Sequence, residues 1–149
     1  MNVYKRILVP TDGTPLSLKA AREAAALAKD LDATLTAIYV MAPWTPPMIL
    51  ESVALPAEVF DERAYSKAVE VTANEALEKV RAAADAEDVA CDTLAVTEDH
   101  PWQGIVKAAK KCDLIVMASH GRTGIAAALL GSETRAVLAH ASTPVLVCH

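Results

Sequence analysis

Near the start of the chain lies the run Lys5-Arg6-Ile7-Leu8-Val9-Pro10-Thr11-Asp12-Gly13-Thr14-Pro15. Its apolar residues Ile7, Leu8 and Val9 favour a strand, and the turn-forming residues that follow predict that the strand ends near residue 10. Residues 17–30 are rich in Ala and place apolar side chains at helical spacing. Residues 33–40 return to a strand-like apolar pattern. This part of the chain therefore predicts a strand, a helix and a second strand.

The same alternation continues to the end of the chain. Further helices are predicted over residues 61–86, 102–111 and 132–140, and further strands over residues 92–97, 114–118 and 144–148. Strands separated by segments of helix length imply crossover connections and a parallel sheet. Because the strands are almost continuously apolar, both faces of that sheet should be covered. We predict one α/β domain over residues 1–149, with five parallel strands and helices on both faces.

Composition narrows the class of protein. The chain has 149 residues, 53% of them hydrophobic, and a net charge of −5, which excludes intrinsic disorder and disfavours nucleic acid as a partner. We expect no membrane span, because prolines interrupt the longest uncharged run, and no secretion signal at the N-terminus. Cys91, Cys112 and Cys148 form no metal or dithiol pattern. We therefore expect a cytoplasmic protein without a metal site.

One connection does not fit the regular alternation. It runs from Met41 to Phe60, contains four prolines and is unusually apolar. Loops of this length are uncommon in compact domains unless they cover a site or bind a partner. Two interpretations stay open: a loop packed on its own protein, and a lid or partner-contact patch.

Two segments that follow strands carry residues suited to a ligand. Asp12 follows the first strand, where it could accept hydrogen bonds from an adenine amine or a ribose hydroxyl, or simply form a turn and helix cap. Residues 117–124 follow the fourth strand and lead to Gly131 and Ser132 at a helix start. Glycine allows a close backbone approach, and the amides at a helix N-terminus attract anions. Together the two segments predict an anion-binding crevice.

Three segments carry a resemblance to a known family: Ile7-Leu8-Val9-Pro10-Thr11-Asp12-Gly13, Ile115-Val116-Met117-Ala118-Ser119-His120-Gly121-Arg122 and Pro144-Val145-Leu146-Val147. With them the chain resembles the universal stress protein (UspA-like) family over essentially its whole length. The resemblance implies a Rossmann-like, doubly wound five-stranded parallel sheet with strand order 3-2-1-4-5 and a crevice between strands one and four. It also implies a homodimer, which we place at the last strand, Thr143 to Cys148, because an exposed apolar edge strand invites pairing.

The ATP-binding branch of that family carries the motif G-x2-G-x9-G-[ST]. Gly121, nine residues, and then Gly131 and Ser132 match its second half. Ala118 replaces the first glycine and adds a methyl group near the ribose. Glu133 adds a carboxylate in the first helical turn, which would compete with a triphosphate unless a divalent cation lay between them.

Carried over residue by residue, the resemblance implies a nucleotide site. Its members are Pro10, Thr11, Asp12, Val40, Met117, Ala118, His120, Gly121, Arg122, Gly131, Ser132, Glu133 and Thr134. Asp12 would meet adenine or ribose, and the Val40 backbone would meet the base. Ala118 and Gly121 would face the ribose and first phosphate, and the start of the last helix would receive the outer phosphates.

The function implied is an adenine-nucleotide (ATP) binding regulatory module, with Mg or Mn as a possible companion, that acts through assembly or partner binding. The alternative is a dimeric interaction protein of the same fold, involved in stress response, that binds no nucleotide. No catalytic residue is predicted, because Ser119 and His120 lack a nucleophile elbow and no P-loop lysine follows the glycines. Slow ATP hydrolysis is the most that we expect.

Overall fold

The computed structural model describes residues 3–46, 61–121 and 129–149. Its strands are β1 (Arg6–Pro10), β2 (Thr34–Met41), β3 (Cys91–Thr97), β4 (Leu114–Ala118) and β5 (Val145–Cys148), and its helices are α1 (Pro15–Leu31), α2 (Glu62–Asp85), α3 (Pro101–Ala109) and α4 (Ser132–His140). Every predicted strand and helix is present, with ends that differ by one or two residues. Helices α1 and α3 begin earlier than predicted, at prolines whose fixed φ suits the first helical turn.

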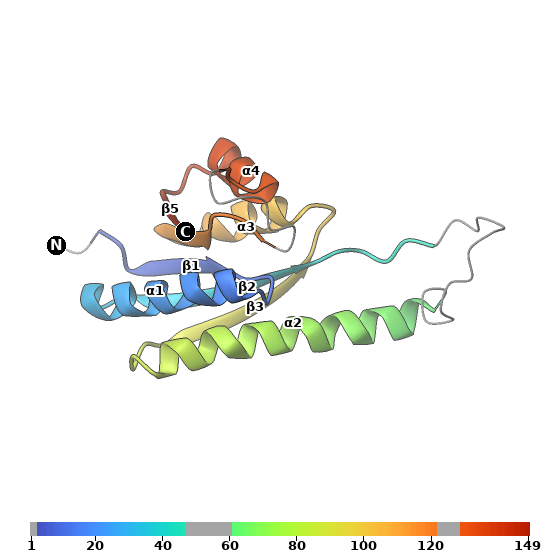
Figure 1. Cartoon of the computed structure of the whole chain (residues 1–149), viewed down its shortest axis with the longest axis horizontal. Helices are drawn as coiled ribbons and strands as arrows, with labels where there is room; N and C mark the ends of the chain where they lie inside the picture. The colour runs from blue at the N-terminus through green and yellow to red at the C-terminus, as the bar shows by residue number, and fades with distance from the viewer. Residues whose placement is uncertain (1–2, 47–60, 122–128) are drawn as a thin grey trace.

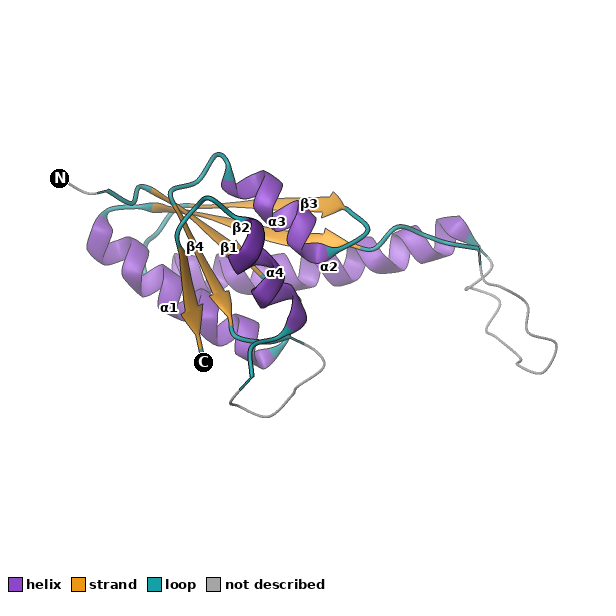
Figure 2. Ribbon diagram, turned by 90° about the horizontal axis from the view of Figure 1, so that it is seen from above, coloured by secondary structure: helices purple, strands orange, loops and turns teal. Residues whose placement is uncertain are grey.

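The five strands form one parallel sheet in the order β3-β2-β1-β4-β5. Figure 1 shows α1 and α2 on one face of the sheet and α3 and α4 on the other, and Figure 2 shows the twist of the strands from above. The predicted doubly wound fold and strand order are confirmed. The chain moves outward from β1 in one direction to β2 and in the other to β4, so the carboxyl ends of β1 and β4 flank a crevice.

Each face of the sheet has its own core. In β1, Ile7 and Val9 point to the face covered by α1 and α2, whereas Leu8 points to the face covered by α3 and α4. This alternation is the period of two that any strand shows. All three side chains are fully buried, as expected for a sheet that is covered on both sides.

Helix α3 lies unusually close to the sheet because Gly104 faces β2 and β3. A Cβ atom added at Gly104 would lie 2.7 Å from Cγ2 of Val40 and 3.0 Å from Cγ2 of Val96, well inside the ordinary separation of about 3.5–4.0 Å between carbon atoms. The N-terminus of α3 is thereby held near the end of β2.

At the amino ends of the strands, Asp113 ties the start of β4 to the start of β1. Its Oδ2 atom accepts hydrogen bonds from the backbone amides of Lys5, at 3.0 Å, and Arg6, at 2.9 Å. These bonds, together with the Arg6 guanidinium, lower the pKa of the Asp113 carboxyl. The ionised carboxylate therefore helps to hold the two strands between which the crevice opens.

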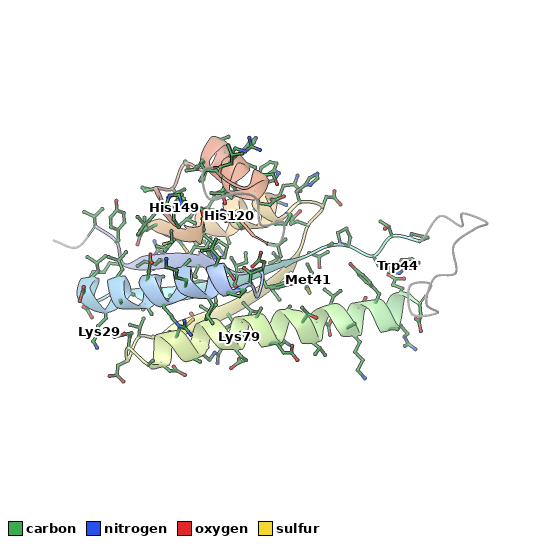
Figure 3. All side chains as sticks on the ribbon, in the orientation of Figure 1. Lys29, Met41, Trp44, Lys79, His120 and His149 are labelled. Carbon is green, nitrogen blue, oxygen red and sulfur yellow. The ribbon has the colours of Figure 1, made fainter. Side chains whose placement is uncertain are left out.

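The segment that leaves β2 passes over the N-terminal half of α2 (Figures 1 and 3), where Tyr65 Oη donates a hydrogen bond to Ala42 O at 3.1 Å. Residues 47–60 of the predicted long connection lie outside the described residues, so both interpretations of that connection stand. None of the helices in the described ranges is long and apolar enough to span a bilayer.

Candidate functional site

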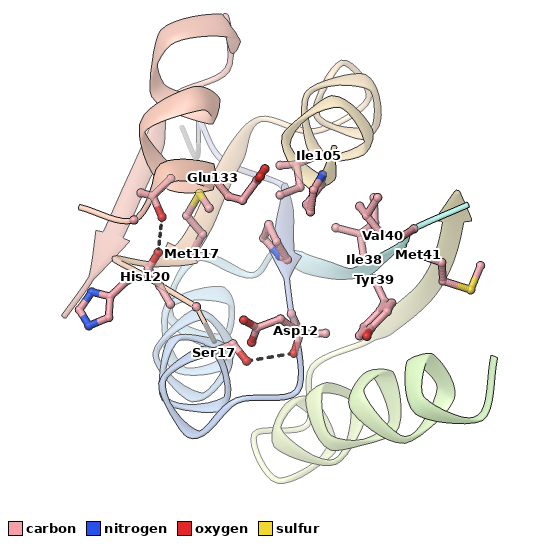
Figure 4. A pocket seen from close by; sticks show the side chains of 18 of the residues that line it. Asp12, Ser17, Ile38, Tyr39, Val40, Met41, Ile105, Met117, His120 and Glu133 are labelled. Carbon is pink, nitrogen blue, oxygen red and sulfur yellow. Dashed lines mark hydrogen bonds between the residues drawn. The ribbon is translucent and has the colours of Figure 1, made fainter. Parts of the chain in front are cut away.

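A cavity of about 520 Å³ lies at the carboxyl ends of β1, β2 and β4 (Figure 4). Its walls include every predicted site residue that the structure describes: Pro10, Thr11, Asp12, Val40, Met117, Ala118, His120, Gly121, Gly131, Ser132, Glu133 and Thr134. Arg122 lies outside the described residues. Residues that are far apart in the chain are thus brought together around one hollow, at the place where the strand order predicts it.

Asp12 is fixed by the turn that starts α1. Its Oδ1 atom accepts hydrogen bonds from the amide of Thr14, at 3.0 Å, and from Thr14 Oγ1, at 2.6 Å. Thr14 is in turn the N-cap of α1, and Gly13 supplies the positive φ of +81° that the turn needs. The two interpretations of Asp12 are therefore compatible, because one carboxylate oxygen forms the turn while the side chain lines the cavity.

The carboxylate of Asp12 is directed toward the loop that follows β4 (Figure 4). A Cβ atom added at Gly121 would overlap Asp12 Oδ2. Glycine at position 121 is thus what lets the loops after β1 and β4 come together. This close approach gives a physical reason for the glycine that the sequence motif contains.

A second close approach joins the end of β4 to the start of α4. The amide of Gly131 donates to Ser119 O at 2.8 Å, and Thr134 Oγ1 donates to Ala118 O at 2.9 Å. A Cβ atom at Gly131 would lie 3.0 Å from the Cα atom of His120. The N-terminus of α4 is therefore pinned against the strand end at the cavity wall.

Helix α4 presents backbone donors at the cavity. Gly131 is its N-cap and has no side chain that could accept from the first-turn amides. The first amides of any helix lack intrahelical partners, and the helix dipole places partial positive charge there. Ser132, Glu133 and Thr134 are the first three helical residues, and all three line the cavity. This end of the cavity is suited to a small anionic group.

The carboxylate of Glu133 is bound to the neighbouring helix. Its Oε2 atom accepts a hydrogen bond from the amide of Trp102 in the first turn of α3, at 2.8 Å. The Trp102 ring stacks on His140 of α4, with ring centres 4.1 Å apart, and packs against the core. Trp102 thus has a packing role. The link from Glu133 to Trp102 spans 31 residues of chain and has no signature in the sequence.

His120 lies at the rim of the cavity. Its imidazole points away from Asp12 (Figure 4), and Nδ1 lies 2.9 Å from Oγ of the buried Ser119. The imidazole is thus engaged with its neighbour in the chain. Contact between the His120 side chain and a phosphate stays a prediction.

Of the wall formed by β2 and α2, only Val40 was predicted from the sequence. Tyr39 and Met41 line the cavity from β2 (Figure 4). Tyr65 and Val69 line it from α2. Tyr65 and Val69 lie four residues apart, so they share one face of the helix. That spacing was the one available signal, but the same spacing also marks ordinary core positions. This wall gives the cavity an apolar end opposite the amides of α4.

The charge of the described wall is negative. Asp12 and Glu133 contribute carboxylates, and none of the lining residues within the described ranges is Lys or Arg. The described part of the chain also holds no group of three or more His, Cys, Asp or Glu residues that could bind a metal ion. Any anion recognised here would be bound mainly through backbone amides and hydroxyl groups.

The sequence model of the universal stress protein family matches residues 3–149. This chain belongs to that family. It is 41% identical over 148 residues to universal stress protein MJ0531 of Methanocaldococcus jannaschii. The aligned region covers 98% of this chain and 82% of the relative.

Solved structures of similar proteins agree with the assignment of this chain to the universal stress protein family. Protein MJ0577 is 27% identical and superposes with a TM-score of 0.76, covering 97% of this chain and 95% of its own. A universal stress protein solved in complex with cAMP is 28% identical, with a TM-score of 0.71 and coverage of 99% and 98%. The fold is thus shared with a relative that binds an adenine nucleotide.

Proposed function

We propose that this universal stress protein binds an adenine nucleotide in the cavity between β1 and β4 and acts as a regulatory module. Bound nucleotide would change its assembly or its affinity for a partner. The observation that carries this proposal is the combination of an apolar wall, the fixed carboxylate of Asp12 and the first-turn amides of α4 around one cavity. A base, a ribose and a phosphate need these three environments. The cAMP complex of a relative supports the same ligand class.

In the proposed complex, Asp12 accepts hydrogen bonds from ribose or adenine, and the Val40 backbone meets the base. Gly131, Ser132 and the amides of Glu133 and Thr134 receive phosphate. ATP is included among the ligands, with Mg²⁺ or Mn²⁺ as its companion. Since the described residues provide no cluster of metal ligands, the cation would be held chiefly by the nucleotide's own phosphates.

Phosphoryl transfer is not the proposed activity. Enzymes that transfer phosphoryl groups use Lys, Arg or metal ions to stabilise the charge of the transition state. The described wall supplies neither Lys nor Arg. Any hydrolysis of bound ATP would accordingly be slow and incidental to regulation.

We also propose a homodimer that forms through the strand from Thr143 to Cys148. Strand β5 is at the edge of the sheet, and Leu146 on it is 45% exposed. An exposed apolar edge strand is stabilised by pairing with a second copy. We propose a cytoplasmic location as well, because Cys91, Cys112 and Cys148 are all free thiols.

The test is calorimetric titration of nucleotide-stripped protein with MgATP and AMP. Ser132→Asp places a carboxylate among the α4 amides at an exposed position that suits an acidic residue, so it should abolish binding and leave the fold intact. Gly131→Asp is a less specific test, because its Cβ atom would lie 3.0 Å from the Cα atom of His120 and could displace the backbone there. Ala90→Asp, exposed and outside the cavity wall, is the matched control.

A different result would favour the second candidate, a dimeric interaction protein that binds no nucleotide. Ala118 and Glu133 favour this candidate, since they add a methyl group and a carboxylate to the wall. Absence of binding by the wild-type protein at millimolar nucleotide would leave it as the better description.

A further inference from the structure

Glu133 occupies a position where its charge bears directly on any phosphate chain. Its backbone amide belongs to the first turn of α4, and its side chain lines the same cavity. A phosphate held by that amide would lie within one side-chain length of the carboxylate. Each additional phosphate would bring more negative charge toward a group of the same sign.

The Glu133 side chain is also held in place. Its Oε2 atom is hydrogen-bonded to the amide of Trp102 at the N-terminus of α3, where the helix dipole favours a negative charge. Turning away from an incoming phosphate would break this bond. The carboxylate is therefore a fixed part of the wall.

No Lys or Arg side chain on the described wall offsets this charge. The second acidic side chain that lines the cavity there is that of Asp12. A monophosphate can be accommodated by the α4 amides alone, whereas a triphosphate would need further positive charge. That charge can come from a divalent cation bound to the ligand.

We propose that Glu133 selects nucleotides by the number of their phosphates. Without a divalent cation, the site takes an adenine nucleotide with one phosphate in preference to ATP. Excess Mg²⁺ reduces this preference, because it neutralises the outer phosphates. The inference rests on the proposed function and adds to it which ligand the free site prefers and which residue is responsible.

The experiment compares AMP and ATP by calorimetry at constant ionic strength, first in EDTA and then in excess MgCl₂. Glu133→Gln is the test variant, because an amide oxygen can still accept from the Trp102 amide while the charge is removed. Glu62→Gln is the matched control. Glu62 also lies in the first turn of a helix, but it is exposed and does not line the cavity. Thermal melting confirms that each variant is folded.

We expect wild-type protein in EDTA to bind AMP at least tenfold more tightly than ATP. Glu133→Gln should raise the affinity for ATP about tenfold, equivalent to 1.4 kcal/mol, and change the affinity for AMP less than threefold. Glu62→Gln should change neither. Equal affinities in the wild type, or an equal effect of Glu133→Gln on both nucleotides, would overturn this inference alone. Failure of every adenine nucleotide to bind would overturn the proposed function and this inference with it.

Discussion

The substitution Gly121→Ala tests the contact that brings the two strand-end loops together. A methyl group at this position overlaps Asp12 Oδ2 and lies 3.6 Å from Asp12 Cγ. The other oxygen, Oδ1, is held by two hydrogen bonds from Thr14. The carboxylate must therefore rotate away from the β4 loop, or break its bonds to the turn.

The expected size of the effect follows from that displacement. If Asp12 Oδ2 accepts a hydrogen bond from the nucleotide, moving it removes a bond to a charged acceptor, worth about 1.5–3 kcal/mol. The affinity for AMP should then fall roughly 10- to 150-fold. Stability should change by less than about 1 kcal/mol, because Gly121 is exposed and does not need a positive φ, and an alanine there restricts the unfolded chain.

The assay pairs calorimetric titration with urea unfolding followed by circular dichroism. Asp12→Asn removes the charge of the same acceptor, so the double variant with Gly121→Ala should bind little more weakly than either single variant. The reasoning is refuted if Gly121→Ala binds AMP within twofold of wild type. It is also refuted if the two substitutions weaken binding additively, since they would then act on different contacts.

Four further predictions address the scaffold. Gly104→Ala should destabilise the fold by about 1 kcal/mol, because overpacking outweighs the gain in helix propensity, and Val40→Ala should relieve part of that loss in a urea-unfolding cycle. Asp113→Asn should lower stability at neutral pH. Since the folded pKa of Asp113 is lowered, the difference from wild type should shrink as pH falls below the ordinary value of about 3.9, as measured by unfolding across pH. If the proposed dimer forms through β5, Leu146→Asp should shift it toward monomer in sedimentation equilibrium, and an unchanged mass would place any dimer contact elsewhere. Burial raises the pKa of Cys148 to about 12, so a thiol reagent should modify it only after unfolding, and rapid labelling of the native protein at this position would contradict the structure.

The fold could be predicted from local pattern. The order of strands and helices, and the parallel sheet, could be predicted from two signals. These are the alternation of strand and helix periodicity and the turn residues between elements, such as residues 11–15. The strand order depended on the family resemblance, because apolar periodicity does not say which strands are neighbours. Details such as the start of α1 at Pro15 depend on cap geometry, which shifts predicted ends by a residue or two.

The candidate site was predictable where backbone geometry demanded particular residues. Gly121 and Gly131 mark close approaches that no other residue allows without displacement, so they leave a pattern in the sequence. The hydrogen bond that the Trp102 amide donates to Glu133 leaves no such pattern, because any helix N-terminus can donate to a carboxylate from a distant segment. The cavity positions of Tyr65 and Val69 were equally unpredictable from the sequence, since helical spacing does not distinguish a residue that lines a cavity from one in the core.

This difference has a consequence for how the cavity could discriminate among ligands. The first-turn amides of α4 attract any anion and vary little with sequence, so they supply affinity without choosing among phosphate esters. Choice must come from side chains, and the charged side chains on the described wall are the carboxylates of Asp12 and Glu133. Asp12 is placed at the end where a sugar or base would lie, and Glu133 at the end where phosphates would lie. Selectivity in this universal stress protein would then depend on repulsion at one end and hydrogen-bond acceptance at the other. A change at position 133 could therefore alter which nucleotide is sensed without altering the fold.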